Sequence, residues 1–164
     1  MGDFDPLRAL GVLLEHRVQF VVIGGLAARV WGSPSITNDL DICYERRRDN
    51  HERLAAALRE LQATLRGAPA GIPFLLDART IEFGDSFTFD TIAGALDCLG
   101  TPAGTRGYAD LVSSASREEI GDGLVVQVTS LDDLLRMKRA AGRRKDLLEV
   151  EILSAVKEER ERES

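Results

Sequence analysis

Residues 20–42 read FVVIGGLAARVWGSPSITNDLDI, and this stretch decides the fold. It opens with four consecutive apolar residues, 20–23, which predict a short strand buried on both faces. Gly24-Gly25 ends that strand, and a short helix is expected over 26–31. Polar and apolar residues then alternate over 39–44, which predicts a second strand. The stretch therefore predicts two strands connected through a glycine turn and a helix.

The segments on either side add helices and short strands to this unit. Helices are expected over 6–17, 50–66 and 108–114, with a loop over 69–73. Short strands are expected at 87–89, 95–99 and 124–128. Ser130 caps a further predicted helix, and Gly142 separates it from a last helix that starts near residue 143. This order predicts an α/β (α+β) fold, a small mixed sheet flanked by helices, with C-terminal helices from about residue 130. The 164 residues suit one domain spanning 1–164.

The composition excludes several classes of protein. With 44% hydrophobic and 29% charged residues, the chain is typical of a globular protein with a sizeable core. It has nothing close to the roughly 18 consecutive apolar residues that span a membrane, and its acidic N-terminus differs from a secretory signal. We therefore expect a cytoplasmic protein with no membrane partner. The net charge of −6 argues against a surface built for long nucleic acids, and Cys43 and Cys98 are expected to be free thiols.

Asp39 and Asp41 are the first candidate metal ligands. Side chains alternate along a strand, so these two carboxylates project from the same face, roughly 7 Å apart. Two like charges repel each other there unless a cation neutralises them. Mg²⁺ prefers oxygen ligands and typically binds one or two carboxylates together with substrate phosphates. A D-x-D pattern alone is also common on solvated strand faces, and it gains weight here from the glycine pair before it.

Gly24-Gly25 is the candidate phosphate-binding turn. Because glycine has no Cβ atom, backbone N–H groups at such a turn can approach a phosphate closely. The helix that follows directs the positive end of its dipole toward the same anion. A strand, a glycine turn and a helix N-terminus facing paired aspartates together predict a site for Mg²⁺ and a nucleoside triphosphate.

A third carboxylate is expected, because an attacking hydroxyl must lose a proton and a second metal ion needs a ligand. Asp97 is the first candidate, since it lies on the short apolar strand 95–99, which can pair beside Asp41. Asp90 is the alternative. A basic cluster that includes Lys138 lies on the last two predicted helices, where a lysine can stabilise charge on a leaving pyrophosphate.

These segments resemble the signature of a known superfamily. The runs 20–28 and 32–42 look like the DNA polymerase-β-type nucleotidyltransferases. More narrowly, they look like the small bacterial nucleotidyltransferases related to abortive-infection toxins of the AbiEii type. The run 134–147, LLRMKRAAGRRKDL, is similar to the lysine and R-x-K-D motifs of that group. The middle of the chain matches the superfamily pattern chiefly at residues 94–97.

The resemblance implies the nucleotidyltransferase fold and two-metal chemistry, in which a hydroxyl attacks the α-phosphate of a nucleoside triphosphate and pyrophosphate leaves. It assigns catalysis to Asp39, Asp41, Asp97 and Lys138, with the three aspartates holding Mg²⁺, and nucleotide binding to Gly24, Gly25, Lys145 and Asp146. In this reading Asp97 also acts as the base, and Lys138 and Lys145 offset phosphate charge.

Three positions depart from the pattern of the family. Many members have Gly-Ser where this chain has Gly24-Gly25. Ser35 stands where relatives often have a basic residue, and Glu149 stands where the toxin group usually has Asp. The acceptor stays open: a tRNA or a protein, in a toxin–antitoxin pair with an antitoxin partner, or a small molecule as in antibiotic nucleotidyltransferases. An open acidic cleft would indicate a cationic drug. A third reading is a non-catalytic module that binds a nucleotide or a partner.

Overall fold

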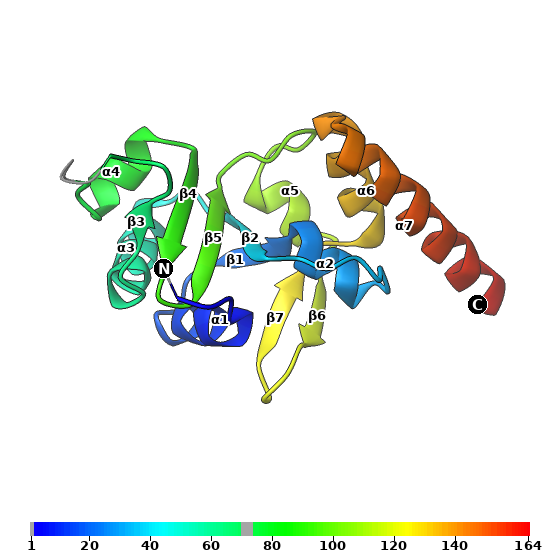
Figure 1. The fold of residues 1–164 in the computed structure, drawn as a ribbon, viewed down its shortest axis with the longest axis horizontal. Helices are drawn as coiled ribbons and strands as arrows, with labels where there is room; N and C mark the ends of the chain where they lie inside the picture. The colour runs from blue at the N-terminus through cyan, green and yellow to red at the C-terminus, as the bar shows by residue number, and fades with distance from the viewer. Residues whose placement is uncertain (1, 70–73) are drawn as a thin grey trace.

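A computed structural model describes residues 2–69 and 74–164. Its centre is a mixed sheet of seven strands in the order β3-β4-β5-β2-β1-β7-β6 (Figure 1). In chain order the strands are β1 Phe20–Ile23, β2 Asp39–Tyr44, β3 Thr64–Leu65, β4 Ser86–Thr91, β5 Gly94–Leu99, β6 Ser116–Glu119 and β7 Val125–Val128. The helices are α1 Pro6–Glu15, α2 Gly24–Val30, α3 Arg48–Glu60, α4 Ala78–Phe83, α5 Tyr108–Val112, α6 Leu131–Ala141 and α7 Arg144–Glu163.

The two strands predicted from the opening stretch lie side by side at the middle of the sheet. β1 pairs antiparallel with β2, and β2 pairs in parallel with β5, so β2 has a neighbour on each side. Leu40 and Ile42 on β2 are completely buried, as are Val21 and Val22 on β1. The face opposite the core therefore displays the polar residues of β2, which begin with Asp39.

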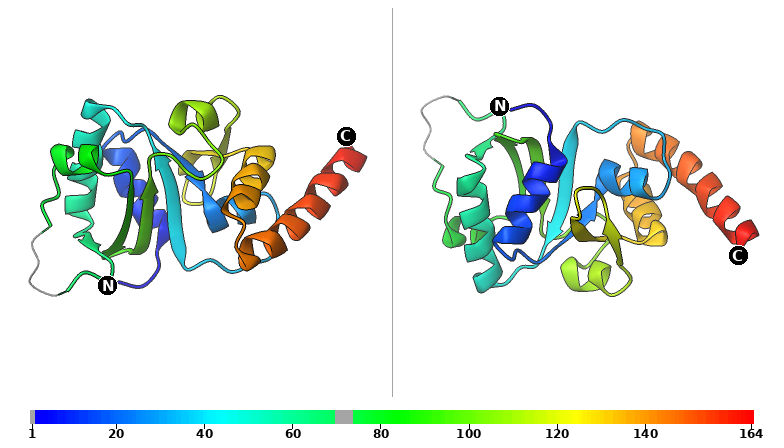
Figure 2. Two further views of the ribbon diagram at one scale, coloured as in Figure 1. Left: turned by 90° about the horizontal axis from the view of Figure 1, so that it is seen from above. Right: turned by 90° about the horizontal axis from the view of Figure 1, so that it is seen from below.

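Helices cover this sheet in two groups. α1 and α3 contact each other, and their leucines at positions 10, 13, 54 and 58 are all fully buried in the core. They lie together in both views of Figure 2. α2 contacts β2 and α6, and α6 in turn contacts α7. The predicted C-terminal helical part thus lies beside the glycine turn at the end of β1.

The last helix leaves the body of the molecule as it proceeds to the C-terminus (Figure 1). Its contacts with the rest are made along one side: Lys157 pairs with Asp132 at 2.7 Å, and the Arg160 guanidinium lies 4.9 Å from the centre of the Trp31 ring. The Trp31 indole donates a hydrogen bond of 2.8 Å to the carbonyl of Thr129. Among residues 2–69 and 74–164, no helix is both long and apolar enough to cross a membrane.

Two sequence predictions about the middle of the chain were wrong or incomplete. The helix expected over 50–66 ends at Glu60, because Gln62 has a positive φ of 52° that breaks the helix. Thr64–Leu65 then pairs with β4 as an edge strand. α4 and β6 were not predicted at all, since their short sequences have no clear period. Of the loop expected over 69–73, residues 70–73 lie outside the described residues.

The other expected elements are present with small shifts at their ends, and α2 begins at Gly24 rather than near Leu26. Cys43 and Cys98 are both buried free thiols, as predicted. The mixed sheet flanked by helices, with helices at the C-terminus, confirms the predicted fold class.

Candidate active site

Three aspartates meet on the polar face of the sheet. In the parallel pair β2–β5, Asp41 lies directly opposite Asp97, and Asp39 lies opposite Ala95. The alternation of side chains puts all three carboxylates on one face, and one oxygen from each lies within 4.8 Å of the others. Asp90, the alternative third carboxylate, is on β4 and is not part of this group. The structure therefore brings together the three predicted ligands.

Burial and neighbouring negative charges make Asp41 and Asp97 costly to ionise. Burial is the main cause that raises the pKa of Asp41 to about 8, and the charges of Asp39 and Asp97 raise it further. Lys138 acts in the opposite direction. Burial also raises the pKa of Asp97. A divalent cation would relieve this repulsion, and carboxylate oxygens are ligands that Mg²⁺ prefers in proteins. The residues present thus fit a divalent metal ion.

The glycine pair is sterically required at this point of the chain. Gly24 has a φ of +67°, in the left-handed region, and a Cβ atom there would overlap the carboxylate of Asp41. A Cβ at Gly25 would lie only 2.7 Å from Oγ1 of Thr37. The turn can therefore pass directly above the aspartates only because both side chains are missing.

Lys138 faces the aspartates from α6, and its position depends on Asp146. The Asp146 carboxylate is 1% exposed and lies 3.8 Å from the ammonium of Lys138. Arg143 donates to it from Nε at 2.6 Å and from its backbone N–H at 3.2 Å. Burial, the largest influence, raises the pKa of Asp146, but the hydrogen bonds and charge of Arg143 outweigh it and the pKa is lowered overall. Asp146 is thus an ionised support for two cations, and its carboxylate is enclosed by them.

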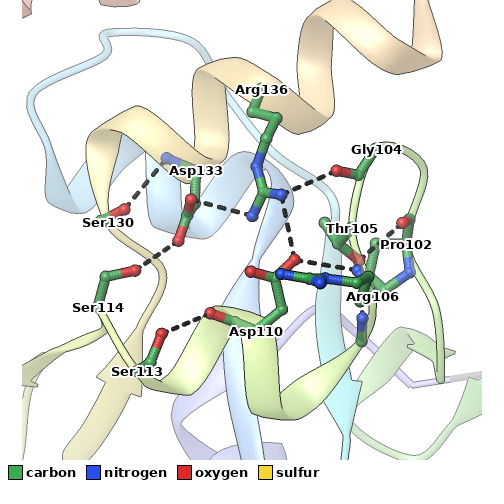
Figure 3. A network of polar contacts seen from close by, with 11 residues as sticks. Pro102, Gly104, Thr105, Arg106, Asp110, Ser113, Ser114, Ser130, Asp133 and Arg136 are labelled. Atoms are coloured by element: carbon green, nitrogen blue, oxygen red, sulfur yellow. Dashed lines mark hydrogen bonds and ion pairs between the residues drawn. The ribbon is translucent and has the colours of Figure 1, made fainter.

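A polar network fixes the helix that carries Lys138 (Figure 3). Arg136 donates to Asp110 on α5 at 3.1 Å, to the carbonyl of Gly104 at 3.0 Å and to Asp133 at 3.1 Å. Asp133 also accepts a hydrogen bond of 2.6 Å from Ser114. These contacts join α5, α6 and the loop after β5. Arg136, two residues before Lys138, therefore holds α6 in place through its hydrogen bonds.

The loop before β2 is held by Glu149 of α7. Ser33 donates to one oxygen of the Glu149 carboxylate at 2.6 Å, and Ser35 donates to the other at 2.9 Å. Thr37, further along the loop, donates to the carbonyl of Asp39 at 3.0 Å. Glu149 is itself buried. The C-terminal helix thereby sets the path of the segment that leads into Asp39.

Arg66 is a site residue that the sequence analysis missed. It follows the edge strand β3, and its guanidinium donates to Asp97 at 3.0 Å and to Asp90 at 3.2 Å. The segment was expected to be helical, which would have placed this side chain elsewhere. The only signal for it was indirect: an arginine just before Gly67, at the start of a loop.

Two cavities adjoin the aspartates and share Asp41, Asp97, Lys138 and Arg143 among their lining residues. The larger, about 730 Å³, also contains Gly25, Asp39, Arg66 and Lys145, with Ile36 and Leu148 near its edge. The smaller, about 260 Å³, has mostly apolar walls, among them Leu99, Pro102 and Met137, together with Ser86 and Thr88. Beyond the shared residues, the larger cavity thus adds the cations Arg66 and Lys145, whereas the smaller adds several apolar side chains.

Comparison with known proteins identifies the fold. No family model and no curated protein match the sequence. Among solved structures, the lincomycin-bound lincosamide antibiotic adenylyltransferase LnuA is similar over 94% of this chain and 99% of its own, with 11% identity and a TM-score of 0.63. ANT(2'')-Ia in complex with adenylyl-2''-tobramycin is similar over 90% of this chain and 84% of its own, with 16% identity and a TM-score of 0.57.

A third similar structure comes from Thermotoga maritima. It is TM1012, described as a nucleotidyltransferase, and the similarity covers 97% of this chain and 98% of that one, with 16% identity and a TM-score of 0.55. The chain therefore has the nucleotidyltransferase fold, as the sequence resemblance implied. The narrower likeness to AbiEii-type toxins stays a prediction.

Proposed function

We propose that this protein transfers a nucleoside monophosphate from a Mg²⁺-bound nucleoside triphosphate to an acceptor hydroxyl. The single observation that carries the proposal is the clustering of Asp39, Asp41 and Asp97 within 4.8 Å, beneath a glycine pair that leaves the space above them open. The likeness to nucleotidyltransferase structures supports it at the level of the fold.

Asp39, Asp41 and Asp97 would hold the metal. When bound, Mg²⁺ supplies Lewis-acid polarisation of the phosphate oxygens and neutralises charge on the triphosphate. The acceptor oxygen forms a bond to the α-phosphorus, the bond from that phosphorus to the β-phosphate oxygen breaks, and pyrophosphate leaves. Asp97 accepts the proton of the hydroxyl, because burial raises its pKa and so makes its carboxylate a stronger base.

The basic side chains would stabilise charge on the phosphates. Lys138 is held near Asp41 by the buried Asp146, and Lys145 lines the larger cavity beside Gly25. A positioned cation contributes most where charge develops on the leaving group, because no reorganisation is needed at that moment. We therefore assign the triphosphate to the larger cavity and give Asp146 a positioning role.

The acceptor divides the proposal into two versions. In the first, the acceptor is a tRNA or another protein, and this chain is the toxin of a toxin–antitoxin pair. The second is a small-molecule acceptor, which is favoured by the cavity of about 260 Å³ that adjoins the aspartates and is partly lined by apolar side chains. The structures of LnuA and ANT(2'')-Ia carry an antibiotic or its adenylylated form, which motivates a test of such compounds here. The charged residues that line the smaller cavity are three carboxylates, Asp41, Asp97 and Asp146, and two cations, Lys138 and Arg143, so its charge is nearly balanced and gives a polycationic drug little net attraction.

Label transfer tests the activity. The protein is incubated with each α-labelled nucleoside triphosphate and Mg²⁺, in turn with total tRNA, with cell-extract protein and with panels of hydroxyl-bearing antibiotics. Wild-type transfer to one class, abolished in Asp41→Asn, supports the proposal and selects the acceptor. Nucleotide binding without transfer to any class would favour the non-catalytic binding module instead.

A further inference from the structure

Arg66, just after β3, stands at the end of a row of residues that crosses three further strands, β4, β5 and β2. Its backbone N–H donates to the carbonyl of Thr88 on β4 at 2.9 Å. Thr88 lies opposite Asp97 on β5, and Asp97 lies opposite Asp41 on β2. Residues opposite each other on neighbouring strands project from the same face, and on this face the Arg66 guanidinium reaches Asp97.

The guanidinium is shared between the sheet edge and the site. Its Nε donates to Asp90, while Nη2 donates to Asp97 at 3.0 Å and to the carbonyl of Phe89 at 2.9 Å. The side chain is 35% exposed and lines the larger cavity together with Lys138 and Lys145. Arg66 therefore places a positive charge beside Asp97, one of the three aspartates, on the side of the larger cavity.

A divalent cation and this guanidinium compete for the same carboxylate. Both neutralise Asp97, and two positive charges a few ångströms apart repel each other strongly in a partly buried site. A freed guanidinium would stay in the larger cavity, where its planar fork of donors suits a phosphate. Its partial exposure and long stem permit this movement without a change in the backbone.

We propose that Arg66 is an exchangeable counter-ion: it neutralises Asp97 in the metal-free site, and on metal binding it moves to the triphosphate. This inference rests on the proposed function, because it takes the three aspartates as the metal site. It predicts opposite effects of one substitution on two ligands. Loss of the charge strengthens cation binding and weakens polyphosphate binding.

The test uses the wild type, Arg66→Gln and the matched control Asp90→Asn. Mn²⁺ binding is followed by the electron paramagnetic resonance of the free ion, without nucleotide, and binding of inorganic tripolyphosphate is measured by calorimetry with Mg²⁺ present. We expect Arg66→Gln to bind Mn²⁺ about tenfold more tightly and tripolyphosphate about tenfold more weakly. Asp90→Asn loosens the same sheet edge but removes a negative charge, so it should bind Mn²⁺ as the wild type does or more weakly.

Thermal melts of all three proteins show whether each variant is folded before the titrations are compared. An Arg66→Gln protein that binds Mn²⁺ no more tightly than the wild type overturns the inference. An equal increase in the Mn²⁺ affinity of Asp90→Asn also overturns it, because the increase would then come from a loosened sheet edge. If the wild type binds no Mn²⁺ at all, the proposed function fails together with the inference. Wild-type Mn²⁺ binding with an unchanged Arg66→Gln variant rejects the inference alone.

Discussion

Asp41 and Asp97 face each other across the parallel strands β2 and β5 at the same register position. Asp41 has Ile23 opposite it on its other side, in β1, where the chain enters the glycine turn. A one-residue slip of β5 would turn Asp97 to the other face of the sheet. The site thus depends on the pairing register of three central strands, which the buried side chains between them determine.

Stability without metal should fall as pH rises toward 8. The folded-state pKa of Asp41 is about 8, above the value of about 3.9 in an unfolded chain, so the folded protein retains a proton that the unfolded chain releases. This stabilisation is complete below the unfolded pKa and is lost as pH approaches 8. Melting temperatures in a chelator from pH 5 to 9 should fall for the wild type relative to Asp41→Asn, which cannot titrate there. A constant difference between the two proteins would contradict the assignment.

Gly24→Ala should disrupt the site more than it disrupts the fold elsewhere. The left-handed φ costs about 1–2 kcal/mol for any side chain, and the added Cβ would also overlap the Asp41 carboxylate. Gly123→Ala is the control, because Gly123 has a φ of +75° with nothing within 4 Å of a Cβ. Denaturation should show a lower free energy of unfolding in both variants, whereas metal binding should be weakened only by Gly24→Ala. Equal metal affinity in the two variants would refute the steric argument.

Asp146→Asn should destabilise the protein and weaken nucleotide binding. The change removes a buried charge and leaves Lys138 and Arg143 without their shared partner, which we expect to cost about 1–2 kcal/mol. Asp132→Asn removes an exposed pair with Lys157 and should change stability less. Urea denaturation compares the variants. If Asp146→Asn binds nucleotide as tightly as the wild type, the positioning role of Asp146 is wrong.

Glu149→Asp tests the loop that leads into Asp39. The shorter side chain cannot keep both hydrogen bonds to Ser33 and Ser35, so a loss of about 0.5–1.5 kcal/mol is expected. Metal affinity should fall as well, because the loop sets the path of Asp39. Glu151→Asp, on the exposed side of the same helix, makes the same chemical change and should have little effect on either quantity. If the two variants have equal stability and equal metal affinity, the contact of Glu149 with the loop does not position Asp39.

The sequence was sufficient to predict the aspartates and the turn, because both depend on local patterns. Alternation over 39–44 defines which side chains share a face, and the run 95–99 is short and apolar enough to be a strand next to it. Asp97 could be selected over Asp90 because of that neighbouring strand, and the structure brings it, rather than Asp90, to Asp41.

Arg66 could not be predicted in the same way. Its place depends on the left-handed Gln62 and on an edge pairing of only two residues, neither of which leaves a periodic signal. The contact of Ser35 with Glu149 was also hidden, since the two residues are 114 positions apart. Ser35 and Glu149 each depart from the pattern of the family that the sequence resembles, and in the structure they are hydrogen-bonded to each other.

The most direct test of the central claim is calorimetric titration of the protein with each nucleoside triphosphate, with and without Mg²⁺, for the wild type and Asp41→Asn. Asp122→Asn, at an exposed turn, serves as a control. We expect nucleotide binding that requires Mg²⁺ in the wild type and in Asp122→Asn, and that is lost in Asp41→Asn. The proposed function is wrong if the wild type binds no nucleoside triphosphate, or if binding is the same with and without Mg²⁺ and in Asp41→Asn.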